Sequence, residues 1–182
     1  MRVIAGSARS LQLEAPEGMD TRPTTDRIKE TLFNMIQREI PDCVFMDLFS
    51  GSGGIGIEAL SRGAKHAYFV ERDTCAFKCI QNNIKHTRME DRATLLKQDV
   101  ASAIPFIGEQ EVSIIFMDPP YHKELEKKAL ELLRNAPYVT TNTMIIVEAA
   151  LDTDFSYLSE YGYCLERQKI YKTNQHAFIY KI

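Results

Sequence analysis

Short apolar runs rich in β-branched residues alternate with helical patterns through the middle of the chain. Apolar residues recur at helical spacing over 55–63, from about Asp73 onward, and over 125–136. The runs that read as strands are 44–49, 67–71, 93–99, 112–118 and 144–150. Strands that alternate with helices favour a parallel sheet covered on both faces. This alternation predicts an α/β fold with a doubly wound core.

The two ends of the chain depart from this alternation. Residues 162–172 and 175–182 read as two strands joined by a turn at Thr173–Asn174, which predicts a hairpin at one edge of the sheet. Residues 2–6 and 10–15 predict a small strand pair. Thr24 or Thr25 is positioned to cap a helix whose apolar face is Ile28, Leu32, Met35 and Ile36. We therefore expect an N-terminal extension over 1–40, followed by the main domain over 41–182.

Length and composition restrict the class of protein. A chain of 182 residues fits one domain, and 45% apolar with 26% charged residues is ordinary for a globular protein. The sequence has no run approaching the ~20 apolar residues of a membrane span, and its start lacks the apolar core of a signal peptide. A cytoplasmic protein without a membrane partner is expected. A metal site is not expected, because the cysteines and histidines show no metal-ligand spacing.

A glycine-rich segment, DLFSGSGGIG (47–56), lies between the first strand and the first core helix. Gly51, Gly53 and Gly56 form a GxGxxG pattern, which lets a ligand approach the main chain closely. Glu71 ends the next strand, where a carboxylate can accept hydrogen bonds from two ribose hydroxyls. The pattern by itself fits nicotinamide enzymes as well as methyltransferases. An acid before the loop, Asp47, favours the methyltransferase reading because it can organise the ammonium of a methionine moiety.

Two further segments follow strands in the predicted sheet. Asp99 ends the third strand, where it can accept from an adenine amine or simply cap a helix. Asp118-Pro119-Pro120-Tyr121 follows the fourth strand, at the edge where α/β sheets bind ligands. An exocyclic base amine is a poor nucleophile because its lone pair is conjugated into the ring. Hydrogen bonds to the Asp118 carboxylate and the Pro119 carbonyl favour a pyramidal nitrogen, while Tyr121 offers a surface for base stacking.

Taken together, these motifs resemble the RsmD-type family of 16S ribosomal RNA guanine-N2 methyltransferases. The segment RPTTDRIKETLFNMI is the family-specific part; the glycine loop and DPPY are shared with other amino-methyltransferases. The resemblance implies a class I S-adenosylmethionine-dependent methyltransferase fold, Rossmann-like, with a seven-stranded mostly parallel sheet whose last strand is antiparallel. It implies a catalytic segment at Asp118, Pro119, Pro120 and Tyr121. The cofactor contacts would be Asp47, Ser50, Gly51, Ser52, Gly53, Gly56, Glu71, Asp99 and Asp118.

The resemblance also implies a partner, small-subunit ribosomal RNA, with Arg9, Arg22, Thr24 and Arg27 near the RNA or the mouth of the site. The net charge of −3 is unusual for a nucleic-acid enzyme, since neutralised phosphates usually supply much of the affinity. Residues 1–30 hold five basic and five acidic side chains, so no local positive field is evident. We therefore expect the substrate to be an assembled or assembling ribosomal particle. The resemblance suggests that the enzyme itself is a monomer.

Three other functions remain open from the sequence. A DNA amino-methyltransferase acting on adenine N6 or cytosine N4 also uses DPPY, but such enzymes usually carry a target-recognition region for which this chain has little room. A nicotinamide-dependent oxidoreductase accounts for the glycine loop and leaves DPPY unexplained. A non-catalytic RNA-binding scaffold is disfavoured by the intact Asp118.

Overall fold

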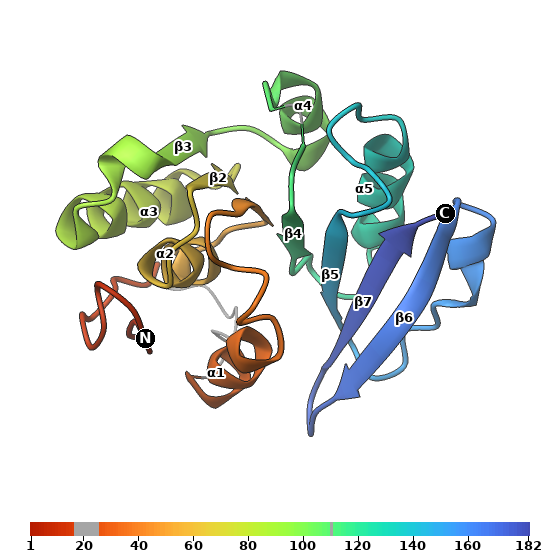
Figure 1. Cartoon of the computed structure of the whole chain (residues 1–182), viewed down its shortest axis with the longest axis horizontal. Helices are drawn as coiled ribbons and strands as arrows, with labels where there is room; N and C mark the ends of the chain where they lie inside the picture. Colours follow the sequence, from red (N-terminus) through yellow and green to blue (C-terminus); the bar gives the residue numbers. More distant parts are fainter. Residues whose placement is uncertain (17–25, 110) are drawn as a thin grey trace.

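A seven-stranded sheet forms the centre of the computed structural model, which describes residues 1–16, 26–109 and 111–182 (Figure 1). Its strand order is β3-β2-β1-β4-β5-β7-β6. The first five strands pair in parallel, and β7 is antiparallel to both β5 and β6. The predicted mostly parallel α/β sheet is therefore confirmed. The strands are β1 (Val44–Leu48), β2 (His66–Val70), β3 (Ala93–Leu96), β4 (Ile114–Met117), β5 (Met144–Ala149), β6 (Tyr163–Ile170) and β7 (Gln175–Lys181).

Helices cover both faces of the sheet. One hydrophobic cluster includes residues of α1 (Asp26–Met35), α2 (Gly54–Ser61) and α3 (Thr74–Thr87), and the other includes residues of α4 (Val100–Ala103) and α5 (Leu125–Arg134). Along β1, Phe45 joins the first cluster and Met46 the second, because successive strand residues point to opposite faces. Short 3-10 helices span Glu90–Arg92, Ile104–Phe106 and Ser156–Ser159. Within the described ranges, every helix is too short or too polar to cross a membrane.

Local sequence signals account for several element boundaries. Asp73 caps α3 as expected, since its carboxylate accepts the backbone N–H groups of Cys75 and Ala76 at 2.9 Å each. The third strand is shorter than predicted and ends at Leu96. Beyond it, the Gln98 N–H donates to the Leu96 carbonyl at 3.1 Å, a tight turn that takes the chain out of the strand ladder.

The C-terminal hairpin brings its turn to the edge of the sheet where β5 ends. The β5–β7 register pairs Ala149 with Gln175 and Glu148 with His176. The Tyr171 N–H donates to the Asn174 carbonyl at 2.9 Å and closes the turn. The predicted hairpin is confirmed. Its tip lies next to the carboxyl ends of the parallel strands, where ligands bind in α/β proteins.

The N-terminal segment packs against the core through α2. The predicted strand pair is reduced to a single antiparallel bridge between Arg2 and Gln12. Backbone N–H groups that a strand partner would use go to side chains of α2 instead: Ile4 and Ala5 donate to Glu58 at 2.8 and 3.0 Å. Apolar side chains from residues 1–40 belong to the same hydrophobic cluster as the sheet: Val3, Ala8, Leu13, Leu32, Phe33, Ile36 and Ile40. The division at residue 40 stays a prediction.

Candidate active site

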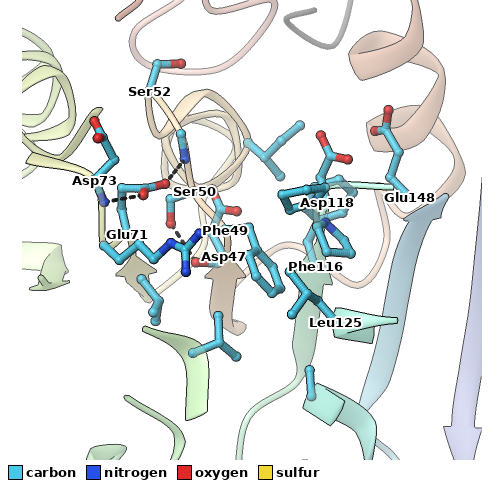
Figure 2. A pocket seen from close by; sticks show the side chains of 18 of the residues that line it. Asp47, Phe49, Ser50, Ser52, Glu71, Asp73, Phe116, Asp118, Leu125 and Glu148 are labelled. Carbon is cyan, nitrogen blue, oxygen red and sulfur yellow. Dashed lines mark hydrogen bonds between the residues drawn. The ribbon is translucent and has the colours of Figure 1, made fainter. Parts of the chain in front are cut away.

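A cavity of about 1320 Å³ opens beyond the carboxyl ends of the parallel strands (Figure 2). It lies where the order of the strands reverses, because the chain runs outward from β1 to β2 and β3 and then crosses back to β4. Its lining comes mainly from the loops after β1, β2, β3 and β4, with contributions from the hairpin tip and the N-terminal segment. The sheet topology therefore assembles one site from distant parts of the sequence.

The glycine loop after β1 turns sharply toward this cavity. Phe49 and Gly51 have φ angles of 63° and 57°, and an added Cβ at Gly51 would meet open space. Ser50 stabilises the turn: its hydroxyl donates to the Asp47 carbonyl at 2.6 Å, and its own carbonyl accepts from the Gly53 N–H at 2.7 Å. The loop thus exposes main chain to the cavity, as a close ligand contact requires.

The later glycines of the pattern shape the loop behind the cavity wall. Gly53 is the N-cap of α2 with φ 79°, in the left-handed region that favours glycine. A Cβ on Gly56 would lie 2.4 Å from the Phe69 ring, so only glycine allows α2 to pack this closely on β2. Neither residue lines the cavity, whereas Ser50, Gly51 and Ser52 do. Direct cofactor contact by Gly53 and Gly56 stays a prediction.

Glu71 joins the glycine loop to the start of α3. Its Oε2 accepts the Gly51 N–H at 2.9 Å, and its Oε1 accepts the Asp73 N–H at 2.7 Å. A carboxylate offers about four acceptor positions, so Glu71 retains capacity for further donors from the cavity. Two ribose hydroxyls are donors of the required kind.

Asp47 lies on the floor of the cavity and is almost fully buried. Burial raises its pKa to about 7; the nearby Glu71 charge acts in the same direction, and a hydrogen bond from the Gly56 N–H at 3.0 Å opposes the shift. A cation in the cavity would favour the ionised form. The position is therefore compatible with the ammonium group expected from the sequence.

Asp99 lines the cavity and also caps α4. Its carboxylate accepts the Ser102 N–H at 3.0 Å and the Ser102 hydroxyl at 2.8 Å. These hydrogen bonds lower the pKa of Asp99 below its usual value. The capping role that the sequence left open is thus present, and the adenine contact stays a prediction.

The Asp118–Tyr121 segment follows β4 and faces the same cavity. Burial, together with the negative charges of Glu148 and Asp47, raises the pKa of Asp118 well above its usual range. Tyr121 keeps 38% of its surface exposed, so its ring is accessible from solvent. Figure 2 shows Asp118 beside Glu148, with Glu71 and the glycine loop across the cavity. The structure therefore brings the two predicted motifs to one site.

Glu148 and Asn174 are lining residues that the sequence did not reveal. Glu148 accepts hydrogen bonds from the Asn174 side-chain amide, from His176 Nε2 at 3.0 Å and from the Tyr121 hydroxyl at 3.4 Å. The sequence held one usable signal, since Glu148 comes near the end of a predicted strand, as Asp118 and Glu71 do. The N-terminus contributes Met1, whose sulfur would lie 2.6 Å from a Cβ on Gly54.

The predicted RNA-contact residues are not all close to the cavity. Arg27 is exposed in the first turn of α1, next to Ile28, which lines the cavity. Arg9 is exposed but lies near Ser61, at the other end of α2 from the glycine loop and roughly 10 Å along the helix axis. Arg22 and Thr24 lie outside the described residues.

The residues around the cavity fit a nucleoside cofactor that carries a positive charge. On one side of the cavity, the carboxylates of Glu71 and Asp47 can accept from hydroxyl and ammonium groups, and the glycine loop exposes its main chain. Asp118 lies on the opposite side of the cavity. These acceptors lie on a mostly parallel sheet with an antiparallel last strand, which is the fold of the class I methyltransferases. The fold also matches the solved structure of yhhF from Escherichia coli with a TM-score of 0.81 and 28% identity, covering 100% of this chain and 97% of that one.

Residues 1–180 match the family described as conserved hypothetical protein 95, and the chain belongs to this family. YlbH of Bacillus subtilis (strain 168) is 39% identical over 150 residues, covering 81% of this chain and 82% of that protein. Ribosomal RNA small subunit methyltransferase D of Escherichia coli (strain K12) is 31% identical over 170 residues, covering 93% and 84%. The resemblance to the RsmD-type family is confirmed.

Proposed function

We propose that this protein transfers a methyl group from S-adenosylmethionine to the exocyclic N2 amine of a guanine in small-subunit (16S) ribosomal RNA. The observation that carries the proposal is the convergence of two motifs on one cavity: the glycine loop with Glu71 on one side, and Asp118–Tyr121 on the other. The relative named ribosomal RNA small subunit methyltransferase D supports the choice of substrate.

S-adenosylmethionine supplies an electrophilic methyl group when bound. Glu71 would hold the ribose, the open glycine loop and Asp47 the methionine part, and Asp99 the adenine. A target base must leave its stack to enter the cavity, where the exposed Tyr121 ring can stack on it. Most of the acceleration then comes from holding the amine in line with the methyl group, worth up to about 7–11 kcal/mol.

Asp118 would serve the amine before and after transfer. As an acceptor with the Pro119 carbonyl, its carboxylate favours a pyramidal nitrogen whose lone pair points toward the methyl group. Once the carbon–nitrogen bond forms and the carbon–sulfur bond breaks, the nitrogen carries one proton too many. The raised pKa of Asp118 makes its carboxylate a suitable acceptor for that proton.

The alternative of a DNA amino-methyltransferase gains no support from the fold. The described residues between Gly56 and Met117 are taken up by the rest of α2, then β2, α3, β3, α4 and β4 with their connections. Such enzymes usually have a separate target-recognition region, and this stretch has no space for one.

The test uses purified protein, labelled S-adenosylmethionine and small-subunit particles from cells that lack the gene. We expect N2-methylguanosine in the ribosomal RNA by mass spectrometry, and no labelled adenine or cytosine in duplex DNA. Protein-free 16S RNA should be methylated more slowly than the particle, because the enzyme has a net charge of −3. Transfer to DNA without N2-methylguanosine formation would overturn the proposal.

A further inference from the structure

Asp118 and Glu148 lie side by side at the ends of two neighbouring parallel strands. The β4–β5 register pairs Met117 with Val147, and Asp118 and Glu148 are the next residues along each strand. Neighbouring strands are about 4.8 Å apart. Both side chains line the cavity, and Figure 2 shows their carboxylates next to each other. A base whose amine reaches Asp118 therefore presents the adjoining part of its edge to Glu148.

The surroundings of Glu148 hold its carboxylate in one orientation. The Asn174 amide and the Tyr121 hydroxyl donate to Oε1, and His176 Nε2 lies 3.0 Å from Oε2. His176 is fully buried and Glu148 is only 4% exposed. Partners on β7, on the hairpin tip and after β4 thus fix the acceptor from three sides. Its position is set before any ligand arrives, which limits the entropy lost on binding.

The position next to the amine differs among the three bases that carry an exocyclic amine. In guanine, the ring nitrogen N1 beside the amine carries a hydrogen and is a donor. In adenine and cytosine, the ring nitrogen beside the amine, N1 or N3, has a lone pair and is an acceptor. An ionised carboxylate can only accept hydrogen bonds. It therefore attracts the N1–H of guanine and repels the ring lone pair of adenine or cytosine.

From this juxtaposition we infer that Glu148 accepts the N1–H of the target guanine and so determines which base is methylated. The inference rests on the proposed function, because it assumes that Asp118 holds the amine to be methylated. It gives the two carboxylates separate tasks. Asp118 binds the reacting nitrogen, whereas Glu148 binds the neighbouring ring nitrogen and selects the base.

The test compares guanosine with 2-aminopurine riboside at the target position. Both bases have the amine at C2, but N1 of 2-aminopurine has a lone pair instead of a hydrogen. The target is first located by mass spectrometry, and each base is then placed there by splinted ligation of the RNA and particle reconstitution. The wild type should prefer guanosine, in kcat/KM, by about tenfold or more, the usual value of a buried hydrogen bond to a charged group.

Two variants probe Glu148 itself. Glu148→Gln offers an amide in place of the carboxylate, and Glu148→Ala removes the acceptor. Both should lose most of the preference for guanosine over 2-aminopurine, while their affinity for S-adenosylhomocysteine stays at the wild-type value. Glu160→Gln changes an exposed carboxylate that is absent from the cavity lining; it is the matched control and should keep the full preference.

The outcomes separate this inference from the proposed function. If the wild type forms N2-methylguanosine and both Glu148 variants keep its preference, the inference is wrong and the proposed function stands. If the wild type forms no N2-methylguanosine, the proposed function is wrong, and the inference that rests on it is wrong as well. The inference is supported if the Glu148 variants lose the preference in kcat/KM because they methylate guanosine more slowly, while their methylation of 2-aminopurine is unchanged or faster. A merely structural role would slow both substrates equally and would overturn it.

Discussion

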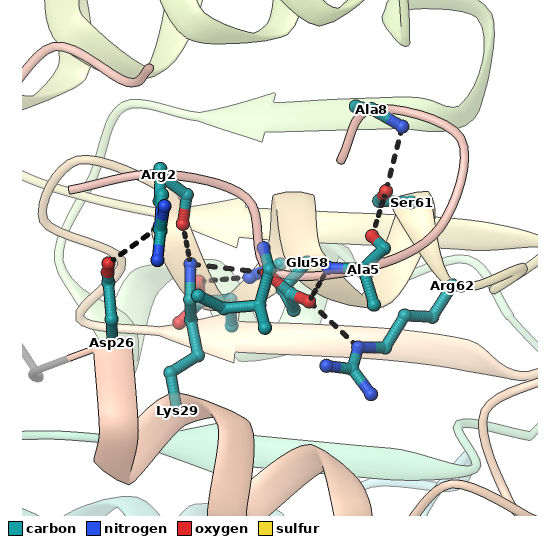
Figure 3. A network of polar contacts seen from close by, with 11 residues as sticks. Arg2, Ala5, Ala8, Asp26, Lys29, Glu58, Ser61 and Arg62 are labelled. Atoms are coloured by element: carbon teal, nitrogen blue, oxygen red, sulfur yellow. Dashed lines mark hydrogen bonds and ion pairs between the residues drawn. The ribbon is translucent and has the colours of Figure 1, made fainter. Parts of the chain in front are cut away.

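The Nζ atom of Lys29 lies 3.2 Å from Oε2 of Glu58, and both side chains are fully buried (Figure 3). Lys29 also donates to the Arg2 carbonyl at 2.6 Å, while Glu58 accepts two N-terminal backbone N–H groups and the Arg62 side chain at 2.8 Å. This ion cluster joins α1, α2 and the N-terminal segment. The same α2 begins at the glycine loop, so the cluster stabilises the scaffold behind the cavity.

Replacing Lys29 with methionine should destabilise the protein strongly. The change keeps the length of the side chain but leaves the buried Glu58 charge with one cation fewer, at a cost of about 3 kcal/mol. We expect the melting temperature to fall by roughly 6–12 °C in a chain of this size, measured by calorimetry. Lys78→Met, at an exposed position of α3, is the control and should change little. Equal melting of the two variants would contradict the role of the cluster.

Asp118→Ala should still bind cofactor but lose methyl transfer. The substitution removes the acceptor for the amine, a contact made at the reacting nitrogen, so the rate should fall on the order of 100-fold or more. Single-turnover transfer of labelled methyl measures the rate, and calorimetry with S-adenosylhomocysteine measures binding. Glu124→Ala removes an exposed carboxylate six residues along the chain and should remain active. Near-normal turnover of Asp118→Ala would contradict the proposed role of Asp118 in methyl transfer.

Glu71→Gln should weaken cofactor binding. The charged acceptor for the ribose hydroxyls becomes neutral, and the amide cannot accept both the Gly51 and the Asp73 N–H groups. We expect the Kd for S-adenosylhomocysteine to rise about tenfold or more, measured by titration calorimetry at constant pH. Glu90→Gln changes an exposed carboxylate before β3 and serves as the reference. An unchanged Kd in Glu71→Gln would show that the ribose hydroxyls do not bind to Glu71.

Stability should depend on pH through Asp47. Its folded pKa of about 7 lies above the usual 3.8, so the folded state binds the proton more tightly than the unfolded state. The resulting stability is complete below about pH 4 and is lost as the pH rises through 7, with a slope approaching 1.4 kcal/mol per pH unit between these values. Denaturant unfolding from pH 5 to 8 measures this slope. Asp47→Asn should remove this contribution, and an identical slope in the variant would refute the assignment.

The sequence predicts the fold well because the sheet depends on local patterns. β4 is entirely apolar and β1 is apolar except for Asp47, since both faces of each strand are buried, and the glycine loop and DPPY follow them directly. The predicted strand pair at the N-terminus was too long, because the structure of this segment depends on contacts that are distant in the sequence. Its backbone N–H groups bind Glu58 and Ser61, which lie more than 50 positions away in the sequence, and local propensity carries no information about such partners.

In the candidate site too, some residues could be predicted from local sequence patterns, whereas others depend on contacts between distant segments. Asp118 and Glu71 could be found because each ends a predicted strand beside a recognisable motif. Glu148 also lies at a strand end, but its importance depends on which strand neighbours which, and that order follows from the crossover between β3 and β4. His176 and Asn174, which orient Glu148, come from the hairpin and look like ordinary strand and turn residues in the sequence.

The position of Met1 affects how the protein can be handled in the laboratory. Met1 lines the cavity and its sulfur packs over Gly54 at the start of α2, so residues added before it would emerge at the rim of the cavity. A tag fused directly before Met1 would add bulk beside the proposed cofactor site. Ile182 is 71% exposed and is absent from the cavity lining, which makes the carboxyl end the better place for purification tags or fluorescent fusions.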